Sequence, residues 1–353
     1  EPENRSHCYN PFDFVPPDPV GAAMACELFA ANLIPDNPNL KDPYWEDRAR
    51  DILWALAMLV ALDRPPAQRI LSTMARLLGT RTNFEDDEEA YKGSSTEKLV
   101  NQLKVLGTRT SLAELVDIGI SIHDGIKSTR LGSVFDTART YLNNLNRSPM
   151  VAASTASSDW HPRQLREHTG TTVYLSFRPG EMAGFAGIIR LILQQHAHFL
   201  TREFTHRPGT PPIAFFLDEA PQLGTLPSLT DLMDVGRGAG VRLWLFAQYL
   251  GQIRSAYRDR ANGIVGACAV RCFMQPDKEA YELIRSELGT VHNLITGEKR
   301  PLAEHYELTG RTHGDKLLSL ARNDLPALLE KRPAFKTHAD LIGLTPPEVP
   351  KRI

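Results

Sequence analysis

The chain has 353 residues, 42% of them hydrophobic, so it is long enough for more than one domain with a substantial core. Lysine and arginine number 40 against 42 acidic residues, which excludes a basic chain that would bind nucleic acid over its whole surface. No apolar run is as long as a membrane span, and the polar start does not resemble a signal peptide, so we expect neither in these residues.

Apolar spacing predicts a helical segment after a first stretch, residues 1–43, that is rich in proline and asparagine. From Trp45 to Leu62 the apolar residues recur as on one wide face of a helix. Ser111 is expected to cap the helix that begins at Leu112, with Glu114 in the capping-box position. We find no strand pattern between 45 and 145, and the further helices are predicted over 66–78, 95–106, 111–127 and 132–145.

Strands alternate with helices after Ser148, which predicts a parallel sheet with helices on both faces. Ser228 is expected to cap one of the helices, and three glycines, Gly236, Gly238 and Gly240, to end it. The expected elements are a strand over 172–177, a helix over 185–199, strands over 213–218, 241–247 and 267–273, helices over 229–235 and 277–288, and a short helix over 317–329.

Four cysteines, Cys8, Cys26, Cys268 and Cys272, do not form a metal-binding pattern. The Cys-x₃-Cys pair has no second pair and no nearby histidines, so we interpret both residues as core packing. Reduced thiols in a cytosolic setting are expected.

The most informative segment is Pro212-Ile-Ala-Phe-Phe-Leu-Asp218-Glu219-Ala-Pro-Gln-Leu. A short apolar run that ends in two carboxylates is typical of a buried parallel strand whose end reaches a ligand-binding edge. We interpret it as a Walker B motif, in which Asp218 holds a hydrated Mg²⁺ and Glu219 polarises the attacking water. The plainer interpretation is a buried strand that ends in solvated acids.

Three further features are expected at the carboxyl ends of these strands. Gln248 could hydrogen-bond a γ-phosphate and the attacking water, or could only begin a turn. Arg237, in the sequence Gly-Arg-Gly, could reach the nucleotide of a neighbouring subunit in a ring, or could only complement a helix dipole. Arg178-Pro-Gly180 is interpreted as a turn.

The sequence Gly-x₄-Gly-Lys-Ser/Thr of a phosphate-binding loop does not occur in these residues. The nearest similar segment, Thr296-Gly-Glu-Lys, lacks the run of amides that would surround a phosphate. We therefore expect this chain by itself to bind ATP weakly or not at all.

The segment from Phe215 to Gln248 resembles the Walker B region, arginine loop and glutamine motif of type IV secretion coupling proteins, the TraG/TraD-like conjugal transfer ATPase family. Tyr9-Asn-Pro-Phe-Asp13 is similar to the Asn-Pro-Leu segment that this family carries after its phosphate loop. Tyr44-Trp45 looks like the start of the family's inserted all-alpha domain. The resemblance covers about residues 9–60 and 135–290.

The resemblance implies an α/β fold, with a RecA-like, P-loop NTPase-type, mostly parallel sheet and an inserted all-alpha domain. Residues 1–44 would be the N-terminal part of the nucleotide-binding domain, 45–146 the all-alpha substrate receptor, and 147–353 the RecA-like domain with Walker B. The family's membrane helices and Walker A segment lie upstream of where this sequence begins. We therefore expect a soluble piece of a longer protein.

The resemblance also implies a homo-hexameric ATPase at the cytoplasmic face of a bacterial inner membrane. Such a protein recruits effector proteins or relaxase–DNA complexes and works with other type IV secretion components. Asp218 and Glu219 would be the Mg²⁺ and water carboxylates, Gln248 the γ-phosphate sensor, and Arg237 the arginine that acts on a neighbour. ATP would be contacted by Asp218 and Gln248, and both ATP and Mg²⁺ would need the upstream Walker A segment.

Two other functions stay open. One is a non-catalytic adaptor that docks secretion substrates on an inactive nucleotidase scaffold, and the other is a RecA-like DNA translocase outside secretion. Arg254, Arg258 and Arg260 could line a central pore for DNA or form a solvated helix face. The acids from Glu85 to Glu89 are interpreted as a solvated loop, with an acidic docking surface as the alternative.

Overall fold

The computed structural model describes residues 6–37, 42–79, 94–125, 129–168, 170–177, 182–202, 210–274 and 276–288, with short segments beyond residue 289. The chain divides into two compact units, 1–246 and 247–353, and each is described by itself. The acids 85–89, the segment 178–180 and most of the Thr296 segment lie outside the described residues. Over the described ranges, no helix is both long and apolar enough to cross a membrane.

The first unit begins with a short helical turn, η1 (Pro11–Phe14), and helix α1 (Pro19–Leu33). The buried Asn10 side chain accepts from the Phe12 amide at 3.2 Å and donates to the Arg69 carbonyl oxygen at 2.9 Å. Asp18 caps α1 by accepting from the Gly21 amide at 2.7 Å. The Asn-Pro-Phe segment is therefore tied by Asn10 to the helical region that follows it.

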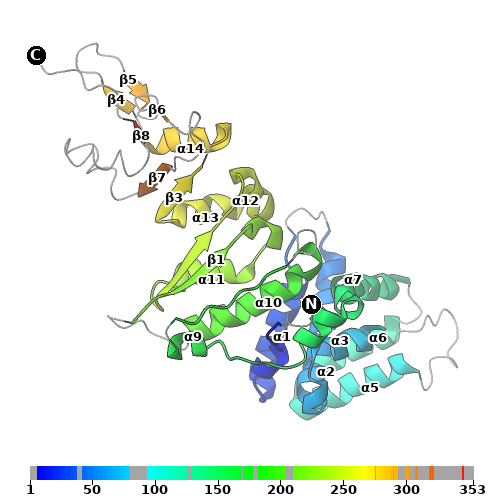
Figure 1. Ribbon diagram of the computed structural model, residues 1–353. Coiled ribbons are helices and arrows are strands. Elements are labelled where there is room, and N and C mark those ends of the chain that lie inside the picture. Colours follow the sequence, from blue (N-terminus) through cyan, green and yellow to red (C-terminus); the bar gives the residue numbers. More distant parts are fainter. Residues whose placement is uncertain are drawn as a thin grey trace, which may run out of the picture. The chain divides into compact units, whose positions relative to one another are not determined.

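Every regular element described between residues 44 and 147 is helical, which confirms the predicted all-helical segment (Figure 1). Its elements are α2 (Tyr44–Asp63), η2 (Pro66–Gln68), α3 (Leu71–Gly79), α5 (Ser95–Thr110), α6 (Ala113–Asp124) and α7 (Thr129–Arg147).

The predicted helix cap at Ser111 is wrong. Ser111 has a left-handed backbone (φ 59°) and ends α5, with its amide bonded to carbonyl oxygens of the last turn of that helix. Helix α6 begins two residues later, after Leu112. The left-handed backbone of Ser111 ends α5 and turns the chain sharply. Ser111 therefore does not also cap α6.

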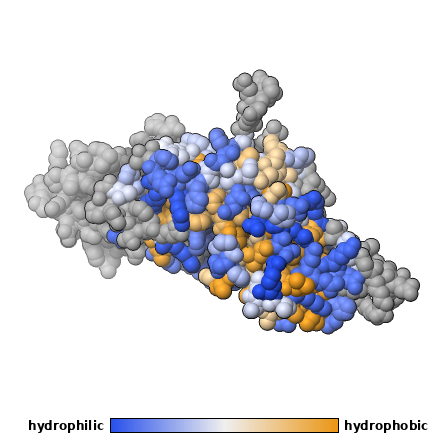
Figure 2. Space-filling model, turned by 90° about the horizontal axis from the view of Figure 1, so that it is seen from below, coloured by the Kyte–Doolittle hydropathy of each residue, from blue (hydrophilic) through white to orange (hydrophobic). Residues whose placement is uncertain are grey.

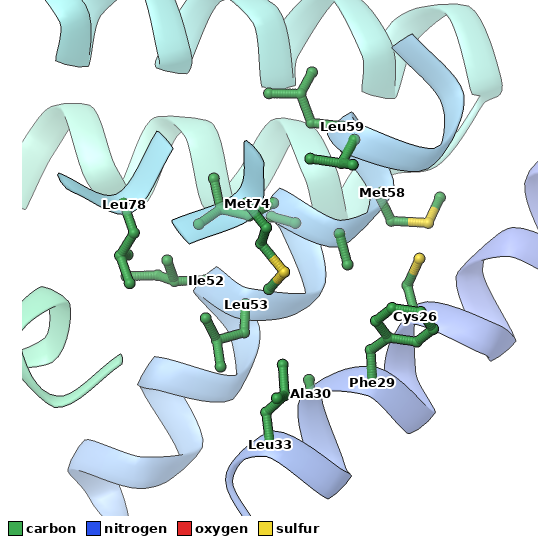
Figure 3. Packing of buried hydrophobic residues seen from close by; sticks show 14 of the residues in the cluster. Cys26, Phe29, Ala30, Leu33, Ile52, Leu53, Met58, Leu59, Met74 and Leu78 are labelled. Carbon is green, nitrogen blue, oxygen red and sulfur yellow. The ribbon is translucent and has the colours of Figure 1, made fainter. Parts of the chain in front are cut away.

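The largest core of the first unit joins α1 to the helical segment. Figure 3 shows apolar side chains of α1, α2 and α3 packed against one another: Cys26, Phe29, Ala30 and Leu33 with Ile52, Leu53, Met58, Leu59, Met74 and Leu78. Leu191 from a much later helix is buried in the same cluster. The predicted domain borders near 44 and 146 stay predictions, and side-chain packing is continuous across both positions.

Helices α8 (Pro149–Ser154), α9 (Gln164–Glu167) and α10 (Met182–Thr201) follow. Helix α10 confirms the expected helix over 185–199. The expected strand over 172–177 is wrong, because this segment is irregular. Tyr174 is 86% exposed, so the apolar residues that suggested a strand do not bury a common face.

The predicted parallel strands are β1 (Ile213–Leu217) and β2 (Val241–Leu245), which pair in parallel from Ile213 beside Val241 to Leu217 beside Leu245. One face of this pair packs on α10 and on α11 (Pro227–Val235). On the other face, the rings of Phe216 and Trp244 are exposed and stack at 5.7 Å.

Helix α11 begins at Pro227 with Leu226 at its N-cap, so the predicted cap at Ser228 is wrong. Ser228 lies inside the first turn and is fully buried. Proline at the first helical position already has the backbone angle that starts a helix, which moves the start forward.

The second unit holds α12 (Leu250–Tyr257), η5 (Arg258–Arg260), α13 (Ala261–Ala267), β3 (Val270–Phe273) and α14 (Lys278–Leu288). Helix α14 and strand β3 confirm those predicted elements, with β3 shorter than expected. Short strands follow: β4 (Thr290–His292), β5 (Lys299–Pro301), β6 (Glu307–Leu308), β7 (Leu318–Ala321) and β8 (Leu344–Thr345).

Two predictions for the second unit are wrong. Strand β3 pairs antiparallel with β7, and β7 occupies residues that were expected to be helical. Cys272 is exposed and outside any disulfide, and it is not core packing, because alternate side chains of β3 point outward. Burial raises the pKa of the Cys268 thiol.

Hydrophobic and hydrophilic side chains alternate in patches on the face shown in Figure 2. Exposed apolar residues occur on several elements, among them Val20 and Met24 on α1 and Val105 on α5. Single exposed apolar residues are normal on soluble proteins. They do not by themselves mark a site.

Candidate functional site

Asp218 and Glu219 lie at the carboxyl end of the parallel strand pair. Two backbone hydrogen bonds join the strand ends around them: the Phe246 amide donates to the Leu217 carbonyl oxygen at 3.0 Å, and the Ala220 amide donates to that of Phe246 at 3.1 Å. The acid pair is therefore fixed at the edge where α/β sheets bind ligands.

The backbone is strained in the segment from Asp218 to Gly224, which we call the acid turn. Glu219 has a left-handed conformation (φ 51°, ψ 41°), which is costly for a residue with a side chain. The short helix η4 (Ala220–Leu223) follows and ends at Gly224, whose φ of 66° and ψ of −151° suit glycine. Gln222 Nε2 donates to Glu219 Oε2 at 3.3 Å, so the turn also orients the glutamate.

The two carboxylates differ in exposure. Asp218 is exposed and Glu219 is partly buried. An exposed carboxylate can bind a hydrated Mg²⁺ through its water shell, since Mg²⁺ keeps several waters and takes phosphate oxygens as further ligands. Across the described residues, no group of three or more histidines, cysteines or acids lies where it could hold a metal ion.

Arg237 lies at the other end of the strand pair, which corrects the expectation that it would fall at the carboxyl ends. Its loop precedes β2, and the Gly240 carbonyl oxygen accepts from the amide of Ile213, the first residue of β1. Five strand residues, at about 3.3 Å each, put roughly 16 Å between this loop and the acid turn. Arg237 is exposed, and within one subunit it cannot contact a ligand at Asp218.

A second arginine, which sequence reasoning missed, holds this loop in place. Arg166 of α9 donates from Nη2 to the carbonyl oxygens of Leu200, at 3.0 Å, and Ala239. Burial lowers the pKa of Arg166. The turn that carries Arg237 is thus anchored to α10 through one guanidinium.

Gln248 is the second residue of the second compact unit and follows the end of β2 by three residues in the chain. Its amide donates to Gln252 Oε1 at 2.8 Å, one turn into α12, and the residue is exposed. This bond ties Gln248 to the first turn of α12, which agrees with the plainer interpretation of a residue that begins a turn. The sensor role stays a prediction.

Sequence reasoning also missed Arg190, which lies in the middle of α10 and is buried. Its Nη1 donates to the Leu223 carbonyl oxygen, at the end of the acid turn. The signal was present in the sequence, because a single arginine interrupts the apolar run Ile188-Ile-Arg-Leu-Ile-Leu. A charge there needs buried partners.

The chain has a RecA-like, P-loop NTPase-type fold, which solved structures share. The chain superposes on the conjugative coupling protein TrwB with a TM-score of 0.57 for the unbound TrwBΔN70 form, at 16% identity over 84% of this chain and 63% of that one. The TrwB complex with ADP and Mg²⁺ gives 0.59, over 85% and 64%. The predicted RecA-like fold class is confirmed.

The chain belongs to the family of type IV secretory system proteins for conjugative DNA transfer, whose model matches residues 1–317. It is 26% identical to the conjugal transfer protein TraG of Escherichia coli over 198 residues. It is 25% identical to protein VirD4 of Agrobacterium fabrum over 299 residues, which is 82% of this chain. The resemblance to coupling proteins is thereby confirmed.

The chain spans only part of the curated relatives that it matches, 30% of TraG and 41% of VirD4.

Proposed function

We propose that this chain is the motor and receptor portion of a coupling protein that hydrolyses ATP to drive transfer through a type IV secretion or conjugation system. The observation that carries the proposal is the acid turn, in which two adjacent carboxylates follow a parallel strand and the second has a strained backbone. Strained residues persist where the surrounding structure holds them, and they cluster at active sites.

In this mechanism Asp218 would hold a hydrated Mg²⁺, and Glu219 would orient the attacking water as a general base. ATP and Mg²⁺ would supply the phosphoryl group and charge neutralisation when a phosphate-binding loop is present. Gln248 would be the γ-phosphate sensor. These roles are supported by the position of the acids and by the nucleotide complexes of TrwB.

Arg237 acts on a neighbouring subunit in a homo-hexamer. The opposite placement of Arg237 and the acid turn supports this role, because a ring in which one end of each sheet faces the other end of the next would bring the two together. The helical segment 45–146 receives the substrate, an effector protein or a relaxase–DNA complex. The full-length protein works at the cytoplasmic face of the inner membrane with the other secretion components.

The test is ATP binding and turnover by the full-length protein with Glu219→Gln. The amide keeps the shape of the side chain but cannot accept a proton, so binding of ATP should be unchanged and turnover should fall by at least about a hundredfold. Glu27→Gln, on the exposed side of α1, is the matched control and should keep wild-type turnover.

Turnover at the wild-type rate in Glu219→Gln would remove this residue from the mechanism. A full-length protein that neither binds nor hydrolyses ATP yet captures substrates would instead be the non-catalytic adaptor.

A further inference from the structure

Arg190 joins two distant parts of the first unit through one buried guanidinium. Its Nε donates to the Asn32 carbonyl oxygen at 2.8 Å and its Nη2 to that of Leu33 at 3.4 Å, both in the last turn of α1. Its Nη1 donates to the Leu223 carbonyl oxygen, where the acid turn ends. Arg190 therefore links the acid turn to the carboxyl end of α1 by hydrogen bonds.

The end of α1 is a suitable partner for a buried cation. The last carbonyl groups of a helix have no donors within the helix and form the negative end of its dipole. Hydrogen bonds from a charged donor are about twice as strong as neutral ones. Removing either partner of such a buried contact costs more than the bond itself contributes, so the contacts of Arg190 with the end of α1 and with Leu223 are costly to break.

Arg50 holds the same helix end from the helical segment. From α2, its Nε donates to the Ile34 carbonyl oxygen at 2.7 Å. Its two terminal nitrogens pair with Asp47 at 2.6 Å and Asp36 at 2.9 Å, which fixes the orientation of the guanidinium. Three successive carbonyl groups, residues 32–34, are thus bound by two arginines from two elements.

We propose that Arg50, the end of α1 and Arg190 form a relay through which the helical segment sets the position of Glu219. A shift of α2 would move the carbonyl groups of residues 32–34, and Arg190 would carry that shift to Leu223 and the acid turn. Both arginines are positioning residues and touch no reactant. The link to ATP hydrolysis rests on the proposed function, whereas the mechanical coupling does not.

The test is amide hydrogen exchange in the full chain, for wild type, Arg50→Gln and Arg190→Lys. The Gln222 and Gly224 amides, which bond to the carbonyl oxygens of Glu219 at 2.8 Å and Pro221 at 3.0 Å, report on the acid turn. Both variants should speed their exchange by about tenfold, the factor expected for one charged hydrogen bond. Arg50→Gln should do so although Arg50 does not touch the turn.

Arg48→Gln is the matched control, because Arg48 lies on the same helix and pairs with Asp51 at 3.0 Å while 60% exposed. It should leave exchange in the turn unchanged. Core amides of α2, at Leu56 and Leu59, should stay at the wild-type rate in all variants, which separates local loosening from global loss of stability.

Wild-type exchange at Gln222 and Gly224 in Arg50→Gln, with faster exchange at the end of α1, would overturn the relay. If Arg190→Lys does not fold, Arg50→Gln alone decides the outcome. In the full-length protein, Arg50→Gln should lower kcat for ATP and leave KM unchanged. A coupled exchange effect in a protein that does not hydrolyse ATP would uphold the relay and refute the proposed function.

Discussion

At the residue scale, the backbone of Glu219 connects structure to the proposed chemistry. A left-handed conformation costs a residue with a side chain about 1–2 kcal/mol. Two hydrogen bonds at the strand ends and the Arg190 contact at Leu223 hold the turn in spite of that cost. We therefore expect the Glu219 backbone to lower the stability of the folded chain, while these contacts keep the glutamate in its position.

This strain can be measured by comparing two substitutions at one position. Alanine at 219 keeps the cost and glycine removes it, so Glu219→Gly should be more stable than Glu219→Ala by about 1 kcal/mol in urea unfolding. Asp117 is exposed in the middle of α6 and serves as the control position. There Asp117→Gly should be less stable than Asp117→Ala by about 1 kcal/mol, since glycine is unfavourable in helices. Equal stability of the two variants at 219 would show that the turn is relaxed.

His196 of α10 gives a prediction for pH dependence. Its Nε2 accepts from Trp160 Nε1 at 3.2 Å and its Nδ1 lies 2.8 Å from the Ile192 carbonyl oxygen, which places the proton of a neutral ring on Nδ1. Burial lowers the pKa of His196 to about 4; the bond to Ile192 opposes this shift, and the charge of His161 adds to it.

Between pH 6.5 and about 4 the unfolded chain binds a proton at His196 that the folded chain does not. The stability supplied by a neutral His196 is complete above pH 6.5 and is lost as pH falls through this range, by up to about 3 kcal/mol. Urea unfolding at pH 7.5 and 5 should show a larger loss in wild type than in His196→Gln. The same loss of stability in both proteins would mean that folding does not lower the pKa of His196.

At the element scale, sequence patterns predicted what local spacing controls. The long helices α2, α10 and α14 and the pair β1 and β2 follow from apolar periodicity, and the acid turn follows from the two carboxylates at the end of an apolar run. The errors depend on contacts far along the chain or on backbone angles. The segment 172–177 is irregular, Ser111 takes a left-handed angle, and β3 pairs with a strand that was expected to be a helix.

In the candidate site, too, local features could be predicted from the sequence and long-range contacts could not. The end of β1 could be predicted from the sequence, whereas the partners of Arg190 could not, because Asn32 and Leu223 are 158 and 33 residues away from it. The loop of Arg237 was placed at the wrong end of the sheet, since it precedes β2 and does not follow it.

Continuous packing across α1, α2 and α10 predicts that these helices unfold together. Phe29 on α1 is 1% exposed and its ring lies 4.8 Å from that of Phe12, so Phe29→Ala should cost about 3–5 kcal/mol. Hydrogen exchange should show that loss equally in α2, at Leu56, and in α10, at Leu191. Val20→Ala, at a position 67% exposed on the same helix, is the control and should change little. A loss confined to α2 would mean that the helical segment unfolds by itself.

At the scale of the whole molecule, the fold is that of TrwB and the family is that of conjugative DNA transfer proteins. One unit holds the acid turn, the Arg237 loop and the helical segment, to which the proposed function assigns ATP hydrolysis, action on a neighbouring subunit and substrate docking. In the proposed function, ATP hydrolysis that depends on Glu219 drives transfer of the substrate.

The most direct test is the transfer frequency of the system's own substrate from cells whose only full-length copy of this protein carries Glu219→Gln. We expect transfer to be abolished although the variant reaches wild-type levels in the cell, and cells with Glu27→Gln should transfer normally. Transfer at the wild-type frequency in Glu219→Gln cells would show that Glu219 does not drive transfer.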